Sequence, residues 1–444
     1  MPLAGLPIGK RSALLLDKEN MTKYSISPMS SLYELYLRHP RISTDSRRIE
    51  PDSVFFALRG ASFDGNRFAA DALEKGAAYA VVDDPSLPNT RPDKADRLIV
   101  VDDALQTLQT LAREHRRELG LPILAITGSN GKTTTKELVS RVLAEKYEVY
   151  ATRGNLNNHI GVPLTLLAMT RDVEFGIVEM GASACGEIAL LCSIAEPNYG
   201  IVTNIGRAHL EGFGGPEGVR RGKGELYDWL ARTGGRVFVP ANDPVLMSMA
   251  AERETLAAEC YPTTLADGVE HHLEGDYNRF NVAAVGRYFG VDDERIRYAV
   301  GSYRPDNHRS QKIRTGQNTL ILDCYNANPS SMQASLVNFR QEPLEGCTRK
   351  ILILGDMLEL GDWSDAEHRH IISLAAEIPD ARILLVGPHF AKAYRSLESR
   401  PADTTLYPSQ EVLAAELRKH PVSQALILVK GSHSIGLERL ADLL

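Results

Sequence analysis

Residues 126–135 read Ile-Thr-Gly-Ser-Asn-Gly-Lys-Thr-Thr-Thr, and this stretch decides the fold of the chain. The apolar run 123–126 predicts a buried strand before it, and residues 136–145 predict a helix after it. Gly128 and Gly131 let the backbone approach a phosphate and point N–H groups at it. The following helix brings its positive end to the same point. The stretch therefore predicts a strand–loop–helix unit that binds nucleotide phosphates.

The loop also carries the side chains that phosphate chemistry needs. Lys132 is placed to neutralise the β- and γ-phosphates, and Thr133 to offer its hydroxyl to Mg²⁺. Two residues separate the glycines, where the common phosphate loop has four. The alternative is a glycine-rich turn that only caps a helix through Thr133, but the flanking strand and helix favour the phosphate loop. The predicted nucleotide contacts are Gly128, Ser129, Asn130, Gly131, Lys132, Thr133 and Thr134.

Polar side chains follow two further predicted strands. Residues 175–178 lead directly into Glu179, and residues 200–202 lead through a short loop to His209. Catalytic groups of parallel sheets lie at the carboxyl ends of the strands. We therefore expect Glu179 to bind the Mg²⁺ that Thr133 holds, and His209 to reach the same crevice. The alternatives are an exposed loop glutamate and a structural histidine.

A basic stretch follows at residues 220–225, Arg-Arg-Gly-Lys-Gly-Glu. We expect it to begin a helix, where positive charge opposes the helix dipole. This misfit favours an anion-handling role or a chemically altered Lys223.

Composition limits the other possibilities. A chain of 444 residues exceeds one hydrophobic core, so two or three domains are expected. The net charge of −7 argues against nucleic acid as a partner. The five cysteines form no CxxC pair, which indicates reduced, buried thiols. No apolar run reaches the ~18 residues of a membrane span, and residues 1–20 do not form a secretory signal. We expect a cytoplasmic protein.

Strand-like runs alternate with helical stretches along the whole chain, which predicts an α/β fold with parallel sheets. We divide it into a flexible extension at 1–20, an N-terminal domain at 21–120, a central domain at 121–310 and a C-terminal domain at 311–444. The helix expected at 105–119 carries a charge run, which predicts a solvated face leading into a linker. The remaining predicted strands are 53–58, 79–82, 98–101, 236–239, 320–322, 350–354, 383–386 and 425–429.

Several stretches together resemble the Mur ligase family of peptidoglycan synthesis. They are residues 127–134, 155–163, 179–182, 204–213, 323–329 and 354–361, with weaker matches at 45–47 and 63–65. The resemblance covers nearly all of the chain after Met21. Its stretches NIGRAHLEGFG, YNANP and LGDMLELG resemble the branch of the family that adds a D-alanyl-D-alanine dipeptide.

The resemblance implies an architecture and an activity. It implies a smaller N-terminal α/β UDP-binding domain, a central P-loop ATPase domain with a parallel sheet, and a Rossmann-like C-terminal α/β domain. It implies ATP-dependent ligation of D-alanyl-D-alanine to UDP-N-acetylmuramoyl-tripeptide through an acyl phosphate. The implied cofactors are ATP and two Mg²⁺ ions, and a monomer is expected.

The resemblance also implies residue roles. Lys223 would be carbamylated and hold a second Mg²⁺ with His209, while Thr133 and Glu179 hold the first. Carbamylation needs a neutral amine, so burial must lower the pKa of Lys223. The family usually has His where Tyr277 stands. Further implied nucleotide contacts are Asn278, Asn281, Arg309, Asp323 and Lys430, and implied substrate contacts are Asp45, Ser46, Arg47, Asp64, Asn158, Asn326 and Asn328.

Two other classes of function stay open at this point. One is a different amino-acid-adding ligase, such as the tripeptide-forming Mur enzyme or a folylpolyglutamate synthase. The other is a P-loop switch that binds nucleotide and ligates nothing. The combination of Glu179, His209 and Lys223 argues against the switch, which needs no second metal. The third residue of the tripeptide, diaminopimelate or lysine, is left open.

Overall fold

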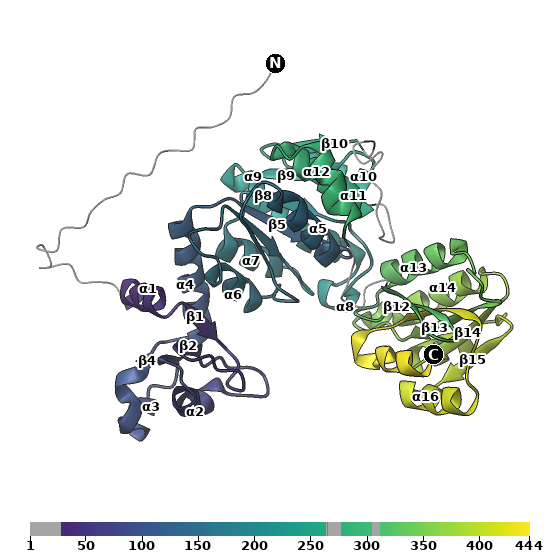
Figure 1. The fold of residues 1–444 in the computed structure, drawn as a ribbon, viewed down its shortest axis with the longest axis horizontal. Coiled ribbons are helices and arrows are strands. Elements are labelled where there is room, and N and C mark those ends of the chain that lie inside the picture. The colour runs from purple at the N-terminus through teal and green to yellow at the C-terminus, as the bar shows by residue number, and fades with distance from the viewer. Residues whose placement is uncertain (1–27, 263, 265–276, 304–310) are drawn as a thin grey trace, which may run out of the picture.

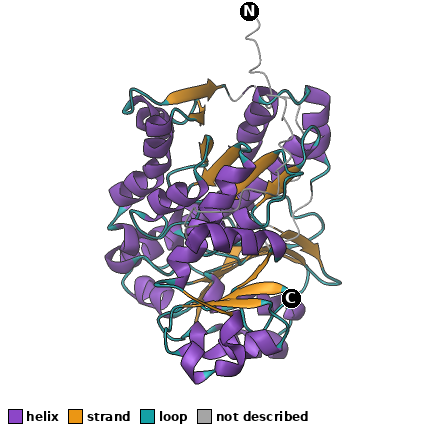
Figure 2. Cartoon of the chain, turned by 90° about the vertical axis from the view of Figure 1, so that its left-hand side faces the viewer, coloured by secondary structure: helices purple, strands orange, loops and turns teal. Residues whose placement is uncertain are grey.

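The protein is built around three β-sheets, which follow one another along the chain (Figure 1). The computed structural model describes residues 28–262, 264, 277–303 and 311–444. The predicted extension 1–20 and Arg309 lie outside these ranges. Helices cover the strands of the larger sheets, so the predicted α/β fold class is confirmed (Figure 2).

The first sheet is small and entirely parallel, in the order β1-β2-β3-β4. Helix α1 (Pro28–Arg38) precedes it. Strand β1 was not predicted from the sequence because its three residues, Arg-Ile-Ser, form no apolar run. The elements are β1 (Arg41–Ser43), β2 (Ser53–Phe56), η1 (Gly65–Phe68), α2 (Ala69–Glu74), β3 (Tyr79–Val82), α3 (Leu87–Thr90), η2 (Pro92–Arg97) and β4 (Leu98–Val100).

The second sheet has six parallel strands in the order β10-β9-β8-β5-β7-β6. All four strands predicted here are confirmed, and the phosphate loop follows the inner strand β5. The edge strands β6 and β10 were missed because they are only partly buried and lack an apolar run. The strands are β5 (Ile123–Thr127), β6 (Val149–Ala151), β7 (Phe175–Glu179), β8 (Tyr199–Val202), β9 (Arg236–Pro240) and β10 (Ala257–Tyr261).

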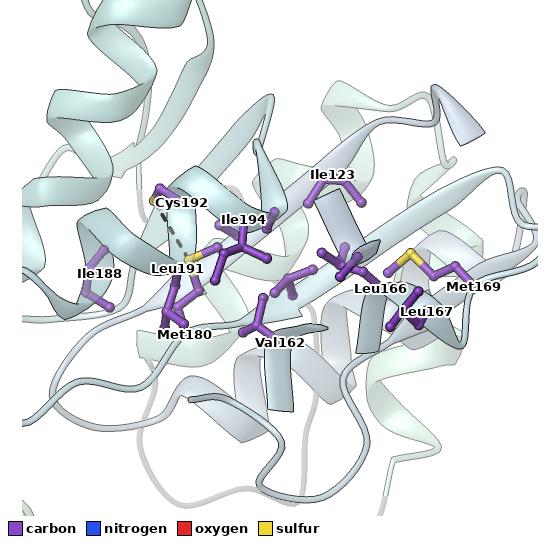
Figure 3. Packing of buried hydrophobic residues seen from close by; sticks show 14 of the residues in the cluster. Ile123, Val162, Leu166, Leu167, Met169, Met180, Ile188, Leu191, Cys192 and Ile194 are labelled. Atoms are coloured by element: carbon purple, nitrogen blue, oxygen red, sulfur yellow. Dashed lines mark hydrogen bonds between the residues drawn. The ribbon is translucent and has the colours of Figure 1, made fainter. Parts of the chain in front are cut away.

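Alternate residues of β5 build two separate hydrophobic layers. Leu124 and Ile126 pack with α5 (Lys132–Ala144), α11 (Tyr277–Tyr288) and α12 (Asp293–Gly301). Ile123 and Ala125 face the other layer (Figure 3). Burial on both faces explains why the strand reads as a continuous apolar run. The second layer contains α4 (Ala104–Leu119), α6 (Gly161–Leu167), α7 (Glu187–Ala195), α9 (Pro216–Thr233) and α10 (Pro244–Ala251).

Helix α4 matches the predicted range, but the prediction of a solvated linker face is wrong at Arg116. The helix packs on α6 and α7, and Arg116 is only 8% exposed. Its guanidinium donates to the carbonyl oxygens of Ala195 at 2.9 Å and Glu196 at 3.1 Å, at the end of α7. Asn198 Oδ1 accepts a third hydrogen bond at 3.0 Å. The arginine therefore caps a buried helix end, where a cation is favoured.

The third sheet has the order β11-β12-β16-β13-β14-β15, and only β11 is antiparallel to its neighbour. One face packs on α13 (Pro329–Gln341), α14 (Ser364–Ala376) and α15 (Pro388–Arg395), and the other on α16 (Gln410–Lys419). The four predicted strands are confirmed, whereas β11 and β15 were missed at the edges. The strands are β11 (Gln311–Arg314), β12 (Thr319–Asp323), β13 (Arg349–Gly355), β14 (Ala381–Val386), β15 (Thr404–Tyr407) and β16 (Ala425–Lys430).

A short helix of the second-sheet unit packs against the third-sheet unit. Helix α8 (Leu210–Phe213) follows β8 and contacts η4 (Gly361–Trp363). It therefore lies between the unit built on the second sheet and the unit built on the third sheet (Figure 1). Leu210 and Phe213 share a buried cluster with Met357 and Leu360. The third sheet is thereby docked near the carboxyl ends of β5, β7 and β8. Among the described residues, no helix has the length and apolar character needed to cross a membrane.

Arg116 gives a test of this packing. Arg116→Met keeps the aliphatic stem but leaves buried carbonyl groups without a donor, so it should destabilise the protein by about 2 kcal/mol. Arg117→Met removes only a largely exposed ion pair with Glu196 and should cost less than about 1 kcal/mol. The measurement is the thermal unfolding midpoint of both variants. Equal midpoints would contradict the capping role of Arg116.

Candidate active site

The loop after β5 has a backbone that favours glycine at two points. Gly128 has a φ of +137° and Gly131 a φ of +75°. A Cβ atom on residue 128 would lie 2.0 Å from Thr203 Oγ1. Lys132 begins α5 and folds back over the loop, where its Nζ donates to the carbonyl oxygens of Gly128 at 2.8 Å and Ser129 at 3.2 Å. The loop therefore presents its backbone and one cation at the same edge of the sheet.

The segment after β8 fixes the shape of this loop. The backbone N–H of Ser129 donates to the Asn204 carbonyl at 3.1 Å, and that of Asn130 donates to Asn204 Oδ1 at 3.1 Å. Thr203 Oγ1 donates to the Asn130 carbonyl at 2.6 Å. Sequence reasoning missed Thr203 and did not assign this role to Asn204. The only signal was their position after a strand next to β5.

Glu179 ends β7 beside Ile126 of β5 and is only 1% exposed. Its Oε1 accepts hydrogen bonds from Thr133 Oγ1 at 3.1 Å and Asn157 Nδ2 at 2.9 Å. Its Oε2 lies 3.7 Å from Lys136 Nζ and makes no hydrogen bond within the described part of the chain. A buried carboxylate with one orphaned oxygen beside a hydroxyl suits Mg²⁺, which prefers oxygen ligands. Sequence reasoning missed Asn157 and Lys136.

Lys223 lies inside α9 and is 1% exposed. Its Nζ donates to the Ala182 carbonyl at 3.1 Å and lies 5.1 Å from the centre of the Phe213 ring. Burial, followed by the positive charge of Lys132, lowers the pKa of Lys223 well below its ordinary value. This shift favours the neutral amine, which is the form that reacts with carbon dioxide.

The predicted helix start at Arg220 is wrong. Helix α9 begins at Pro216, and Glu217 stands in its first turn. The N-terminus is therefore acidic and has no conflict with the helix dipole. Burial is what distinguishes Lys223 from its basic neighbours.

His209 lies between β8 and α8, with a φ of +52°. Its Nδ1 is hydrogen-bonded to Glu359 Oε2, from the unit of the third sheet. Burial lowers the pKa of His209, although the charge of Glu359 opposes this shift. A neutral imidazole has one N–H group, so one ring nitrogen is left as an acceptor or ligand.

A cavity of about 230 Å³ opens beside His209. Both units line it, because His209 follows β8 and the other lining residues belong to the third-sheet unit. Asn328 Nδ2 also donates to Asn130 Oδ1 of the phosphate loop at 2.8 Å. The predicted residues Asn326 and Asn328 are thus brought to His209 and to the loop. The lining residues are His209, Asn326, Ala327, Asn328, Leu358, Glu359, Ser432, His433 and Ser434.

Asp323 and Lys430 end the paired strands β12 and β16 and bind each other. Asn281 is buried and is hydrogen-bonded to Tyr261. Thr134 is half-buried in the first turn of α5. The side chain of Asn278, in α11, is outside the described residues, as is Arg309.

The remaining predicted substrate residues have local roles. Arg47 and Asp45 form a bidentate pair after β1, with N–O distances of 2.8 and 2.9 Å, and this hydrogen bonding lowers the pKa of Asp45 to about 2. The carbonyl of the neighbouring Ser46 accepts a hydrogen bond from Lys75 Nζ at 2.8 Å. Asp64 accepts a hydrogen bond from the N–H of Asn66 and caps η1. Asn158 Oδ1 accepts from Gly161 N at the start of α6.

Comparison with known proteins identifies the family. Three family models match in sequence order: "Mur ligase family, catalytic domain" at residues 40–116, "Mur ligase middle domain" at 126–288, and "Mur ligase, glutamate ligase domain" at 308–433. The UDP-N-acetylmuramoyl-tripeptide–D-alanyl-D-alanine ligase of Bacillus subtilis is 34% identical over 424 residues, which are 90% of this chain and 92% of that protein. The chain belongs to the Mur ligase family. The predicted membership is confirmed.

Other relatives agree with this result. The enzyme of the same name from Treponema pallidum is 34% identical over 91% of this Mur ligase and 93% of its own length. A crystal structure of MurF from Acinetobacter baumannii has a TM-score of 0.79 at 30% identity and covers 91% of this chain and 93% of its own. MurF of Thermotoga maritima, solved in complex with ADP, has a TM-score of 0.76 at 25% identity, over 92% and 97%.

The structure of this Mur ligase brings five of the predicted chemical groups to one edge of the central sheet. Thr133 and Glu179 are hydrogen-bonded to each other. Lys132 influences the pKa of both His209 and Lys223. Among the described residues, no three His, Cys, Asp or Glu side chains gather into a ready-made metal site. A cation here would need hydroxyl, carbamate or phosphate oxygens as well.

Gly128 gives a test of the loop geometry. Gly128→Ala should lower nucleotide affinity by about tenfold or more, because the new methyl group forces Thr203 and the loop apart. Gly154→Ala is the matched control, since Gly154 also has positive φ but nothing lies within 4 Å of a Cβ there. Calorimetric titration with ADP compares the two variants. Similar affinities would show that the loop tolerates the displacement.

Proposed function

We propose that this Mur ligase joins D-alanyl-D-alanine to UDP-N-acetylmuramoyl-tripeptide, with conversion of ATP to ADP and phosphate. The observation that carries the proposal is the match to ligases of that name along about nine-tenths of both chains. The match includes the third-sheet unit, which supplies most of the cavity beside His209. The proposal is thus specific about both substrates.

The first half of the proposed reaction activates an acid. A carboxylate oxygen of the tripeptide attacks the γ-phosphorus of ATP, and ADP leaves, which gives an acyl phosphate. The backbone of residues 128–131 and the Lys132 ammonium offset the charge on the transferring group. Thr133 and Glu179 would hold Mg²⁺, which supplies further charge neutralisation when bound.

The second half forms the peptide bond. The amine of the dipeptide attacks the acyl carbon, loses a proton and displaces inorganic phosphate. The cavity beside His209 is open to such an amine, and Asn326 and Asn328 offer amide groups to hold it. No nucleophile from the protein is needed.

Lys223 has a chemical rather than an electrostatic role in this proposal. Its buried neutral amine adds to the carbon of carbon dioxide, releases a proton to solvent and becomes a carbamate, an anionic oxygen ligand. The carbamate and His209 would hold a second Mg²⁺. The Ala182 carbonyl and the Phe213 ring position the amine.

The remaining assignments complete the proposal. Residues 21–120, 121–310 and 311–444 would act as three domains. Asp45, Ser46, Arg47 and Asp64 would contact the UDP-sugar, and Asn158 the substrate. The nucleotide would meet Asn278, Asn281, Arg309, Asp323 and Lys430. A monomeric state and a cytoplasmic location stay predictions.

The alternatives have less support. Solved folylpolyglutamate synthases resemble this chain at 14–18% identity and share only its fold. A non-catalytic switch has no use for a buried neutral lysine beside the phosphate loop. The full-length relatives therefore favour the D-alanyl-D-alanine-adding ligase over both alternatives.

A ligation assay tests the main proposal. Wild-type protein with ATP, Mg²⁺ and UDP-N-acetylmuramoyl-tripeptide should release ADP rapidly only when D-alanyl-D-alanine is added, and mass spectrometry should detect the pentapeptide. Lys132→Ala should lower the rate by about 10³-fold or more. Running both tripeptides, with diaminopimelate or lysine at the third position, identifies the acceptor. ADP release that ignores the dipeptide would support the switch.

The carbamate has a separate test. Removal of dissolved carbon dioxide should slow the wild-type enzyme, and bicarbonate should restore its rate. Protein equilibrated with ¹³C-bicarbonate should show a carbamate carbon signal by NMR that Lys223→Arg lacks, because an arginine side chain cannot supply the neutral amine. Lys136→Arg is the control for a second buried cation near the site and should keep the signal. A wild-type spectrum without the signal would refute carbamylation.

A further inference from the structure

Glu359 reaches out of the third-sheet unit and ends on His209 of the central sheet. The two residues are 150 positions apart, and Glu359 Oε2 accepts a hydrogen bond from His209 Nδ1. Glu359 lies in the loop between β13 and η4, and His209 in the loop between β8 and α8. The sequence pattern predicts a role for His209 but none for Glu359.

Both residues have a backbone conformation that side chains rarely adopt. The φ angle is +61° at Glu359 and +52° at His209. A left-handed conformation costs a residue with a Cβ atom about 1–2 kcal/mol. The Glu211 N–H, two residues after His209, donates to the Glu359 carbonyl at 3.2 Å and holds the two loops together. Surrounding contacts thus hold both backbones in a strained conformation, and such strain clusters at functional sites.

The contact decides which nitrogen of His209 is available. A carboxylate accepts the hydrogen from Nδ1–H, so the neutral ring keeps its lone pair on Nε2. Histidines that bind metals commonly donate their other nitrogen to a carboxylate in this way, which fixes the tautomer and the ring orientation. Because the carboxylate comes from the other unit, His209 has this arrangement only when the two units are docked.

We propose that Glu359 is a positioning residue that makes His209 a competent cation ligand. His209 is then a competent ligand only when the third-sheet unit is docked. The inference rests on the proposed function for the metal role of His209. The tautomer that it assigns depends only on the contact itself.

A second ion pair in the same interface provides a control. Arg207 NH1 lies 2.6 Å from Glu367 Oε1, and the Arg207 N–H donates to Ser330 Oγ at 2.7 Å. These contacts join the same two units two residues before His209 and do not touch its ring. Loss of Glu367 therefore weakens docking alone, whereas loss of Glu359 also releases the histidine.

Binding of Mn²⁺, followed by electron paramagnetic resonance with a non-hydrolysable ATP analogue, tests the metal role. Glu359→Ala should weaken the His209-dependent Mn²⁺ site by about 10- to 100-fold, as His209→Asn does, while Glu367→Gln stays near wild type. Wild-type Mn²⁺ affinity in Glu359→Ala, together with weakened Mn²⁺ binding in His209→Asn, would overturn the role of Glu359 and leave the metal role of His209 standing. Wild-type affinity in His209→Asn would overturn the metal role of His209 and this inference with it. The ligation assay decides the proposed function independently.

The tautomer gives a readout that does not depend on metal. In metal-free protein labelled with ¹⁵N-histidine, correlation spectra should show the His209 proton on Nδ1. In Glu359→Ala the proton should move partly or fully to Nε2, and in Glu367→Gln it should stay. A proton on Nε2 in the wild type, or an unchanged spectrum in Glu359→Ala, would refute the positioning role.

Discussion

The hydrogen bonds between the phosphate loop and the segment after β8 are the constraint on which the rest of the site depends. Thr203 and Asn204 bind the backbone of residues 129 and 130 from one side, and Gly128 permits the close approach. β8 lies next to β5 in the sheet, so this contact follows directly from strand order. The loop is therefore shaped before any ligand arrives, and ligand binding has less ordering to accomplish.

Burial adds the chemistry to this frame. Glu179 and Lys223 are large polar side chains almost without exposure, and such groups are costly unless they are paired or neutral. Glu179 is partly satisfied by Thr133, Asn157 and Lys136, and Lys223 by the Ala182 carbonyl. Both side chains lie at one edge of the sheet, because β7 ends there at Glu179 and α9 passes there with Lys223. The burial that stabilises the sheet thus also lowers the pKa of Lys223.

Much of this could be predicted from the sequence, because strands buried on both faces leave unbroken apolar runs. Those runs located the inner strands and hence Glu179 and the loop. The edge strands β6, β10, β11 and β15 lacked that signal. Asn157 and Lys136 could not be found, since only tertiary packing brings them to Glu179. The start of α9 was misplaced because the Gly-Gly-Pro run before it was not read as a helix start. Arg116 was misread because a charge run on a helix says nothing about which of its members meets a buried carbonyl.

The cavity beside His209 has walls from two units, which also meet in the buried cluster of Leu210, Phe213, Met357 and Leu360. A small molecule bound there contacts both walls at once, so its binding free energy adds to the stability of the docked arrangement. Such a compound stabilises the contact between the two units, and it also competes with any ligand that binds in the cavity. By the same thermodynamic linkage, any change that favours docking tightens its binding by an equal factor.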